Sequence, residues 1–255
     1  MTSQQKTPLY SRSKQNHRLT VGFTYFEESY RLEKQIEIWK QWPNNIDIFL
    51  VDDGSYRKPA IDVIKDLHLE DWQPTLQLWK CTRDLGFNSH GCRNLIAHYA
   101  QTELIQFLDM DMYFYPSDVA RLRRMALKPR DVVHHNCYNT QTQRIATHPG
   151  HMNAFAIHKD LYWEAGGYDE SFTGHHHGDR ELIERIKELP DVICRHSGQV
   201  VLLNRKGRHG IVTSKVDKTE YPNEDYFYVP LSIPEVEKLK GTKKQRLDFP
   251  FIKLL

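Results

Sequence analysis

The sequence has few cysteines, and their spacing excludes the usual cysteine motifs. Its four cysteines stand far apart at Cys81, Cys92, Cys137 and Cys194, without a Cys-x-x-Cys pair. Zinc ribbons need such pairs, and small disulfide frameworks need a much higher density of cysteine. The pattern suits reduced thiols better than either, and we expect all four to be free.

The sequence also lacks long apolar runs and a large net charge. No window approaches the roughly 18 apolar residues of a membrane span, and the first 18 residues are polar where a signal peptide would be apolar. Lysine and arginine number 35 against 33 acidic residues, which leaves a net charge of only +2. The overall field is therefore too weak to require a nucleic acid or membrane partner. We expect a cytoplasmic protein with no membrane span.

What the sequence does contain is enough apolar material for one large core. The chain has 255 residues, of which 39% are hydrophobic. Residues 1–17 are mainly polar and predict a flexible arm. Residues 18–214 are expected to form the main domain. Residues 215–255, which are rich in lysine and aromatic residues and punctuated by proline, predict an extension that packs on this domain or covers it as a lid.

Strand and helix patterns alternate along the first half of the chain. Buried strands are predicted at 19–23, 46–51, 76–79 and 104–108, with helices at 27–42, 59–67 and 91–99. This alternation indicates an α/β fold with a doubly wound, mostly parallel sheet. After residue 116 the pattern becomes mixed, with helices near 118–127 and 179–189 and strands near 131–135 and 153–157. This mixed region is expected to form a smaller part of the same domain.

Two carboxylates, Asp109 and Asp111, follow the apolar strand 104–108 with one residue between them. Both can turn toward one hard cation, and Mg²⁺ or Mn²⁺ takes such oxygen ligands while leaving positions for phosphates. The alternative is a solvated turn or a helix-capping pair, because this short pattern is common by chance. The buried strand before it, and the aromatic residues after it, favour the metal site.

Two further segments suit parts of a nucleotide diphosphate. Asp52 and Asp53 end a buried strand, where carboxylates can bind a nucleobase imide and a ribose hydroxyl. The segment 83–94 combines glycines, a helix N-terminus, Arg83 and Arg93, a combination that favours phosphate groups. The alternatives are a plain turn after the strand and ordinary helix capping by Asn88 or Ser89.

The order of these segments resembles family 2 glycosyltransferases and their GT-A relatives. Residues 166–172, Gly-Gly-Tyr-Asp-Glu-Ser-Phe, are similar to the family's Gly-Gly-aromatic-Asp-x-x-Phe segment, and Gly178-Asp179 stands where the family has a Glu-Asp motif. The resemblance extends over about 19–210. It implies a GT-A fold and an inverting transfer of a sugar from a nucleotide donor, with UDP favoured, to a hydroxyl of a glycan, glycolipid or small molecule.

The resemblance also implies roles for individual residues. Asp179 would be the general base, with Glu181 as a competing base. Mn²⁺, or else Mg²⁺, would bind Asp109, Asp111 and His209, with His196 as a second choice for the histidine. The remaining expectations are donor contacts at Thr24, Asp52, Asp53, Arg83, Arg93 and Asp109, and acceptor contacts at His151, Gly167, His177 and Glu181.

Three other functions fit parts of the sequence. Basic residues at 238–246 would suit an acceptor base in DNA, although such charge runs usually face solvent. Gly178 replaces the family's glutamate, which would also suit a non-catalytic nucleotide- or glycan-binding module. A nucleotidyltransferase is disfavoured, because residues 24–28 after the first strand contain no glycine-rich basic loop.

Overall fold

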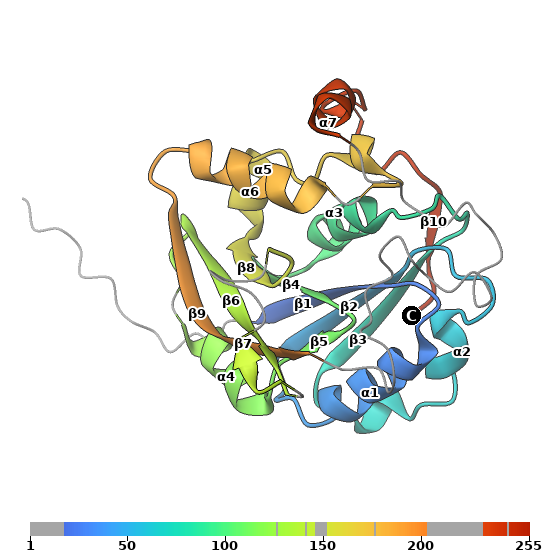
Figure 1. The fold of residues 1–255 in the computed structure, drawn as a ribbon. Coiled ribbons are helices and arrows are strands. Elements are labelled where there is room, and N and C mark those ends of the chain that lie inside the picture. Colours follow the sequence, from blue (N-terminus) through green and yellow to red (C-terminus); the bar gives the residue numbers. More distant parts are fainter. Residues whose placement is uncertain are drawn as a thin grey trace, which may run out of the picture.

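The structure, a computed structural model, describes residues 18–125, 127–140, 142–145, 152–175, 177–202, 232–243 and 245–255. The predicted arm and the predicted site residues His151 and His209 lie outside these ranges. Helices cover both faces of one large sheet (Figure 1). Among the described residues, no helix has the length and apolar character needed to cross a membrane.

Four parallel strands form the first half of the sheet. They are β1 (Leu19–Tyr25), β2 (Ile46–Asp52), β3 (Thr75–Cys81) and β4 (Leu104–Asp109), and they lie in the order β3-β2-β1-β4. All of β2 is buried, because helices cover the sheet on both sides. The predicted parallel sheet is confirmed for these strands.

Alternate residues of the strands supply two separate cores. Ile48 and Leu50 of β2 pack with α1 (Ser29–Trp39) and α2 (Ala60–Ile64) on one face. Phe49 and Val51 pack with α3 (Ser89–Tyr99) on the other. Gly22 lets α3 approach β1 closely, since a Cβ there would lie 2.7 Å from Ile96 Cγ2. The result is that α3 rests tightly on the centre of the sheet.

The second half of the sheet is mixed. It contains β5 (Met112–Tyr113), β6 (Asp131–Asn139), β7 (Arg144–Ile145), β8 (Phe155–His158) and β9 (Ile193–Leu202). β8 runs antiparallel to β4 and β6, whereas β9 runs parallel to β6 and then pairs antiparallel with β5. Sequence analysis did not predict β9. Its first half is polar and largely exposed, so it lacks the apolar pattern of the central strands.

The helices of this half are α4 (Pro116–Arg124), α5 (Lys159–Glu164) and α6 (Gly178–Glu188), together with the short 3-10 turn η2 (Glu170–Phe172). A second such turn, η1 (Leu69–Asp71), precedes β3. Leu182 and Ile186 of α6 belong to the same core as α3, and the two helices lie over the same face of the sheet (Figure 1). The helix predicted at 118–127 is displaced toward the N-terminus as α4, and the helix predicted at 59–67 is shortened to α2.

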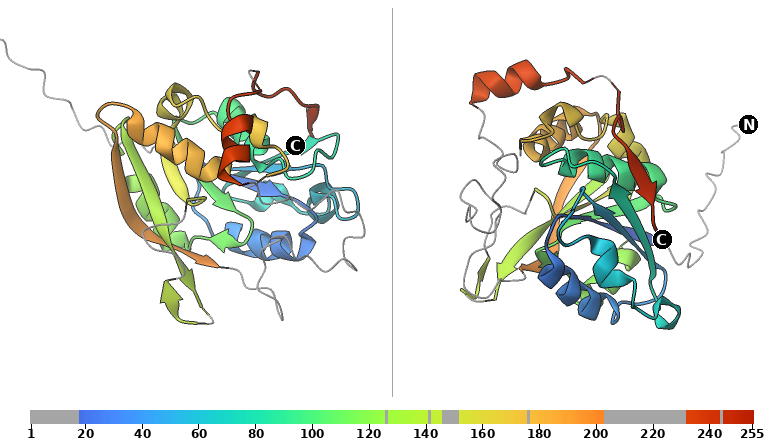
Figure 2. Two further views of the ribbon diagram at one scale, coloured as in Figure 1. Left: turned by 45° about the horizontal axis from the view of Figure 1, so that its top comes forward. Right: turned by 90° about the vertical axis from the view of Figure 1, so that its right-hand side faces the viewer.

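The described C-terminal residues belong to the fold. After α7 (Ile233–Leu239) the chain ends in β10 (Phe251–Lys253), which pairs antiparallel with β3 at the sheet edge. Figure 2 shows this segment crossing beside α3 to reach the sheet. The full order is therefore β10-β3-β2-β1-β4-β8-β6-β9-β5, with β7 beside β6. The idea that the predicted extension also covers the site as a lid stays a prediction.

One buried carboxylate fixes this C-terminal segment. Glu170 is 1% exposed and accepts hydrogen bonds from the backbone N–H of Leu247 at 2.9 Å and from Asn94 Nδ2 at 2.7 Å. Lys243 Nζ lies 3.3 Å from the same carboxylate. Glu170 thereby connects η2, α3 and the segment that leads into β10.

We expect Glu170→Ala to lower the free energy of unfolding by about 3 kcal/mol, because it removes the acceptor of the Leu247 and Asn94 N–H groups and the anionic partner of Lys243. Urea unfolding followed by tryptophan fluorescence measures this loss. The matched control is Glu164→Ala, whose side chain is 45% exposed and pairs with Arg130; its loss should stay below about 1 kcal/mol. Equal losses in both variants would contradict the anchoring role of Glu170.

Candidate active site

The carboxyl ends of three neighbouring strands place most of the predicted donor residues together. Thr24 of β1 is in register with Val51 of β2 on one side and with Asp109 of β4 on the other. The loop after β2 and the acidic turn after β4 therefore flank the end of β1. This edge is where ligands bind in open α/β sheets.

Arg93 connects the acidic turn with the predicted base. This arginine of α3 is 2% exposed, and its Nη2 donates to Asp109 Oδ1 at 2.5 Å. Its Nη1 donates to Asp179 Oδ1 at the start of α6. Tyr168 Oη donates to the same oxygen of Asp179 at 2.9 Å. One guanidinium thus holds Asp109 and Asp179, which come from two separate elements, through its two terminal nitrogens.

Asp111 carries an unsatisfied carboxylate oxygen beside this network. Its Oδ1 is buried and has no hydrogen-bond partner in the part of the chain that the structure describes. Its Oδ2 lies 4.0 Å from Arg31 Nη2. Burial, and next the nearby charge of Asp109, raise the pKa of Asp111 to about 7. A divalent cation would offset this repulsion and satisfy the free oxygen, so the residues present fit Mg²⁺ or Mn²⁺.

Asp52 and Asp53 differ in how their carboxylates are used. The two oxygens of Asp52 accept backbone N–H bonds from Ser55 at 2.7 Å and Ala60 at 2.8 Å, which hold the loop after β2. Asp53 Oδ2 accepts from the Asn88 N–H at 2.8 Å. Its Oδ1 is buried and has no partner among the described residues, and burial raises the pKa of Asp53 to about 8. Asp53 is therefore the better placed of the two to receive an N–H donor from a base.

A glycine after these acids brings the second donor segment close. Gly54 has φ +84°, and a Cβ there would lie 2.9 Å from Asp84 Cα and 3.0 Å from Arg83 O. Only glycine fits this position without strain. Arg83 itself is exposed. The loops after β2 and β3 consequently touch each other at the edge where the donor residues gather.

The predicted acceptor residues are only partly brought together. Glu181 is ion-paired with Arg185, whose Nε lies 2.6 Å from Oε1 and whose Nη2 lies 2.6 Å from Oε2. Arg185 Nη2 also donates to the carbonyl of Gly167 at 2.7 Å. This pairing occupies both carboxylate oxygens of Glu181, whereas Arg93 and Tyr168 both contact the same oxygen of Asp179, Oδ1. His177 immediately precedes α6 and stands two residues before Asp179.

His196, the second choice for a metal ligand, lies away from the acids. It is on β9, in register with His134 of β6, and β8 separates β6 from β4. Three strand spacings amount to roughly 14 Å, so His196 and Asp109 do not share one ion. The first choice, His209, lies outside the described residues.

Sequence reasoning missed three residues of the site. Asn153 Nδ2 donates to Asp109 Oδ2 at 2.8 Å, Tyr168 contacts Asp179, and Arg31 lies near Asp111. Tyr168 is the aromatic residue of the Gly-Gly-Tyr-Asp segment, which marked it as part of a motif without giving its role. Asn153 and Arg31 carry no sequence signal, because only the folded sheet brings them to the acids.

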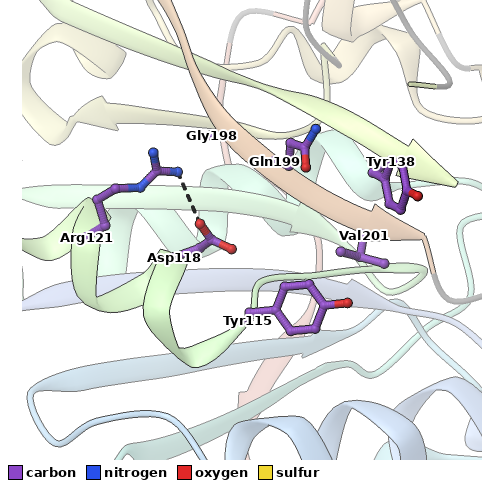
Figure 3. Close-up of a pocket in the computed structure, with 7 residues that line it drawn as sticks. All are labelled: Tyr115, Asp118, Arg121, Tyr138, Gly198, Gln199 and Val201. Carbon is purple, nitrogen blue, oxygen red and sulfur yellow. Dashed lines mark hydrogen bonds and ion pairs between the residues drawn. The ribbon is translucent and has the colours of Figure 1, made fainter. Parts of the chain in front are cut away.

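A separate hollow of about 380 Å³ lies between α4, β6 and β9 (Figure 3). Tyr115 and Tyr138 line it, and the ion pair between Arg121 and Asp118, 3.1 Å long, forms one wall. Gly198 has φ +76°, a backbone conformation that favours glycine, and a Cβ there would also lie 2.4 Å from Arg121 Nη2. Tyr115 follows Asp111 by four residues, so the hollow lies on the continuation of the acidic turn.

Comparison with family profiles gives one match, to the family described as "Glycosyl transferase family 2", over residues 21–186. The match contains every described residue of the network around Arg93. Comparison with curated protein sequences gives no significant match.

Solved structures show the same fold at low sequence identity. The chain resembles a mannosyltransferase from Pyrobaculum calidifontis in complex with GDP-Man and Mn²⁺ (16% identity, TM-score 0.58), S. aureus TarS 1-349 (10%, 0.57) and GalNAc-T7 with UDP, GalNAc and Mn²⁺ (14%, 0.54). These alignments cover 75, 74 and 76% of this chain but only 58, 58 and 45% of the other chains. The fold is thus that of the GT-A glycosyltransferases, and the chain spans about half of the length of these structures.

The raised pKa of Asp111 predicts a pH-dependent gain in stability when its charge is removed. In the presence of a chelator, the free energy of unfolding of Asp111→Asn should be higher than that of the wild type. The difference should grow as pH rises from about 4 to 7, where the unfolded state releases the proton and the folded state keeps it. Above this range it should stay constant at about 4 kcal/mol. Urea unfolding at a series of pH values measures it. The exposed Asp66→Asn is the control, and a pH-independent difference for Asp111→Asn would contradict the burial of its charge.

Proposed function

We propose that this chain, which belongs to glycosyl transferase family 2, moves a sugar from a nucleotide-sugar donor to an acceptor hydroxyl with inversion at the anomeric carbon. A divalent cation, Mn²⁺ or Mg²⁺, assists at Asp109 and Asp111. The observation that carries this proposal is the shared guanidinium of Arg93, which contacts Asp109 on the donor side and Asp179 on the other side. Asp109, which would hold the cation against the diphosphate, and Asp179, which would accept the proton, are thereby held close together.

The cation, when bound, neutralises negative charge on the leaving diphosphate. The oxygen of Asp111 that has no hydrogen-bond partner among the described residues supports the proposal that a cation binds there. Two of the similar structures contain Mn²⁺ together with a nucleotide or nucleotide sugar. Arg93 adds a fixed positive charge at the same place, which also favours an anionic leaving group.

Asp179 is proposed as the general base. A single displacement inverts the anomeric carbon and needs one group that takes the proton from the attacking hydroxyl. Asp179 is 8% exposed, and Arg93 and Tyr168 orient it through one oxygen, Oδ1. Its other oxygen is the one proposed to receive the proton. Tyr168 touches no reacting atom in this scheme and acts as a positioning residue.

Asp53 is proposed to select the base of the donor. Its unpartnered Oδ1 would accept an imide N–H, which uracil and guanine carry and adenine lacks. Such a bond would favour the charged carboxylate and lower the raised pKa of Asp53. The ligands of two similar structures, GDP-Man and UDP, both have this group. We favour a UDP-sugar, as the resemblance of the sequence suggested.

The acceptor is proposed to be a saccharide, glycolipid or small molecule with a free hydroxyl. The DNA alternative has less support, because the basic residues near the C-terminus are largely paired with the protein itself. Lys240, Lys243 and Arg246 lie 3.8, 3.3 and 3.7 Å from Glu181, Glu170 and Asp169. A cytoplasmic location completes the proposal.

Replacement of the proposed base should separate chemistry from binding. We expect Asp179→Asn to reduce release of nucleoside diphosphate by at least about 100-fold, because proton removal contributes that much to such reactions. Donor binding in a thermal-shift assay should remain. Glu181→Gln, which alters the neighbouring carboxylate, should keep activity within about 10-fold of wild type. An active Asp179→Asn variant would refute the role of Asp179 as the base. A wild type without turnover on UDP- and GDP-sugars would refute the enzyme and favour the binding module.

The choice of donor base is tested by thermal shift with UDP-, GDP- and ADP-sugars, with Mn²⁺ or with chelator. We expect UDP-sugars, and more weakly GDP-sugars, to raise the melting temperature only when the metal is present, since ligands that bind the folded state stabilise it. Asp53→Asn should abolish the preference over ADP-sugars. Stabilisation that is equal with all three bases would contradict the role of Asp53.

A further inference from the structure

Two buried thiols converge behind the acids of the donor edge. Cys81 is the last residue of β3 and Cys92 lies in the first turns of α3, and their sulfurs are 3.8 Å apart. A carboxylate oxygen of Asp53 joins them, so that the three ligand atoms all lie within 4.8 Å of one another. Both cysteines are fully buried, and Asp53 is 5% exposed.

The spacing suits a tetrahedral metal ion. With zinc–sulfur bonds of about 2.3 Å, two sulfurs on one zinc ion lie about 3.8 Å apart, and a carboxylate oxygen lies about 3.5 Å from each sulfur. The observed sulfur separation already matches. A shift of the carboxylate that brings its oxygen to this distance from both sulfurs would fill three of the four ligand positions of the tetrahedron.

An independent observation also points to a ligand. Asp53 Oδ1 is buried without a hydrogen-bond partner among the described residues, although the Cys92 thiol interacts with the same carboxylate. Leaving a buried carboxylate oxygen unsatisfied is costly. A cation between this carboxylate and the two sulfurs would satisfy one lone pair of this oxygen, and its second lone pair stays available for the N–H of the donor base.

The donor atoms decide which ions fit. Thiolates select soft or borderline cations such as Zn²⁺, whereas the oxygen-only pair Asp109 and Asp111 suits Mg²⁺ or Mn²⁺. The two clusters are therefore chemically distinct although they lie along the same sheet edge. When the ion binds, both thiol protons and the proton of the Asp53 carboxyl group, where it is protonated, leave to solvent, and no electron is transferred.

We propose that Asp53, Cys81 and Cys92 bind one divalent cation of the Zn²⁺ class, separate from the acidic site at Asp109 and Asp111. The ion ties the loop after β2 to the end of β3 and the start of α3. It therefore fixes the residue proposed to select the donor base, and its fourth position is left for water or a donor atom. Metal binding is measured without nucleotide, so this site stands or falls independently of the proposed transfer reaction.

Metal content is the first test. The full chain is produced with added zinc, dialysed against excess Mg²⁺ so that the acidic site is occupied, and analysed by inductively coupled plasma mass spectrometry. We expect about one zinc per wild-type chain and less than about 0.2 in Cys81→Ser and Cys92→Ser. The matched control Cys194→Ser changes a cysteine on β9, away from the cluster, and should retain the zinc. Thermal unfolding verifies that each variant is folded.

A second measurement does not depend on the folding of the cysteine variants. Co²⁺ added to the wild type in Mg²⁺ should produce a thiolate-to-metal charge-transfer band, and Asp53→Asn should weaken Co²⁺ binding by at least about 10-fold. Three results would overturn the proposal. Two of them are a wild type without zinc or the Co²⁺ band, and zinc that persists in Cys81→Ser. The third is a disulfide between Cys81 and Cys92, which would lower the mass by two hydrogens and leave neither thiol free to react with an alkylating reagent.

Discussion

The buried guanidinium of Arg93 is the interaction on which the candidate site depends. A cation that is 2% exposed needs anionic partners, because an uncompensated buried charge costs several kcal/mol. Its partners, Asp109 and Asp179, come from β4 and α6, so the cost is avoided only when the parallel half and the mixed half of the sheet are both in place. The buried charge of Arg93 thus holds the acidic turn close to Asp179, the predicted base. The helix that carries Arg93 can reach both because Gly22 lets it lie close on the sheet.

The next residue of α3 extends this connection to the end of the chain. Asn94 Nδ2 donates to the Tyr168 carbonyl at 2.9 Å and to Glu170 at 2.7 Å, while its Oδ1 accepts from the Tyr168 N–H at 2.9 Å. Gly167 makes room for this contact, since a Cβ there would lie 2.7 Å from Asn94 Oδ1. Through Glu170 the same network holds the segment that leads into β10. Arg93 and Asn94 therefore orient the Gly-Gly-Tyr-Asp segment. The glycine at 167 is needed for this packing, because any side chain there would collide with Asn94.

Much of this arrangement could be predicted from the sequence, and the rest could not for identifiable reasons. The central strands are short apolar runs buried on both sides, so β2 and β4 were predicted to within a residue or two, and the acids at their ends with them. β9 was missed because its polar, largely exposed first half gives no strand pattern, and β10 because three residues are too few to carry one. Partnerships such as Asn153 with Asp109 are properties of strand order. The convergence of Cys81 and Cys92 likewise follows from how α3 returns past the end of β3, and their spacing of 11 residues matches no metal motif.

The glycine that replaces the family's glutamate before Asp179 has a steric cause. A Cβ on Gly178 would lie 2.3 Å from the ring of His90, which is fully buried at the start of α3. The beginnings of α3 and α6 are therefore packed against each other at this point. A glutamate at 178 would displace the His90 ring or push α6 away, and the carboxylate of Asp179 would then move off the guanidinium of Arg93. Glycine at 178 is thus a condition for the contact between Asp179 and the guanidinium of Arg93 in this chain. This weakens the view that glycine at 178 marks a site that has lost its chemistry.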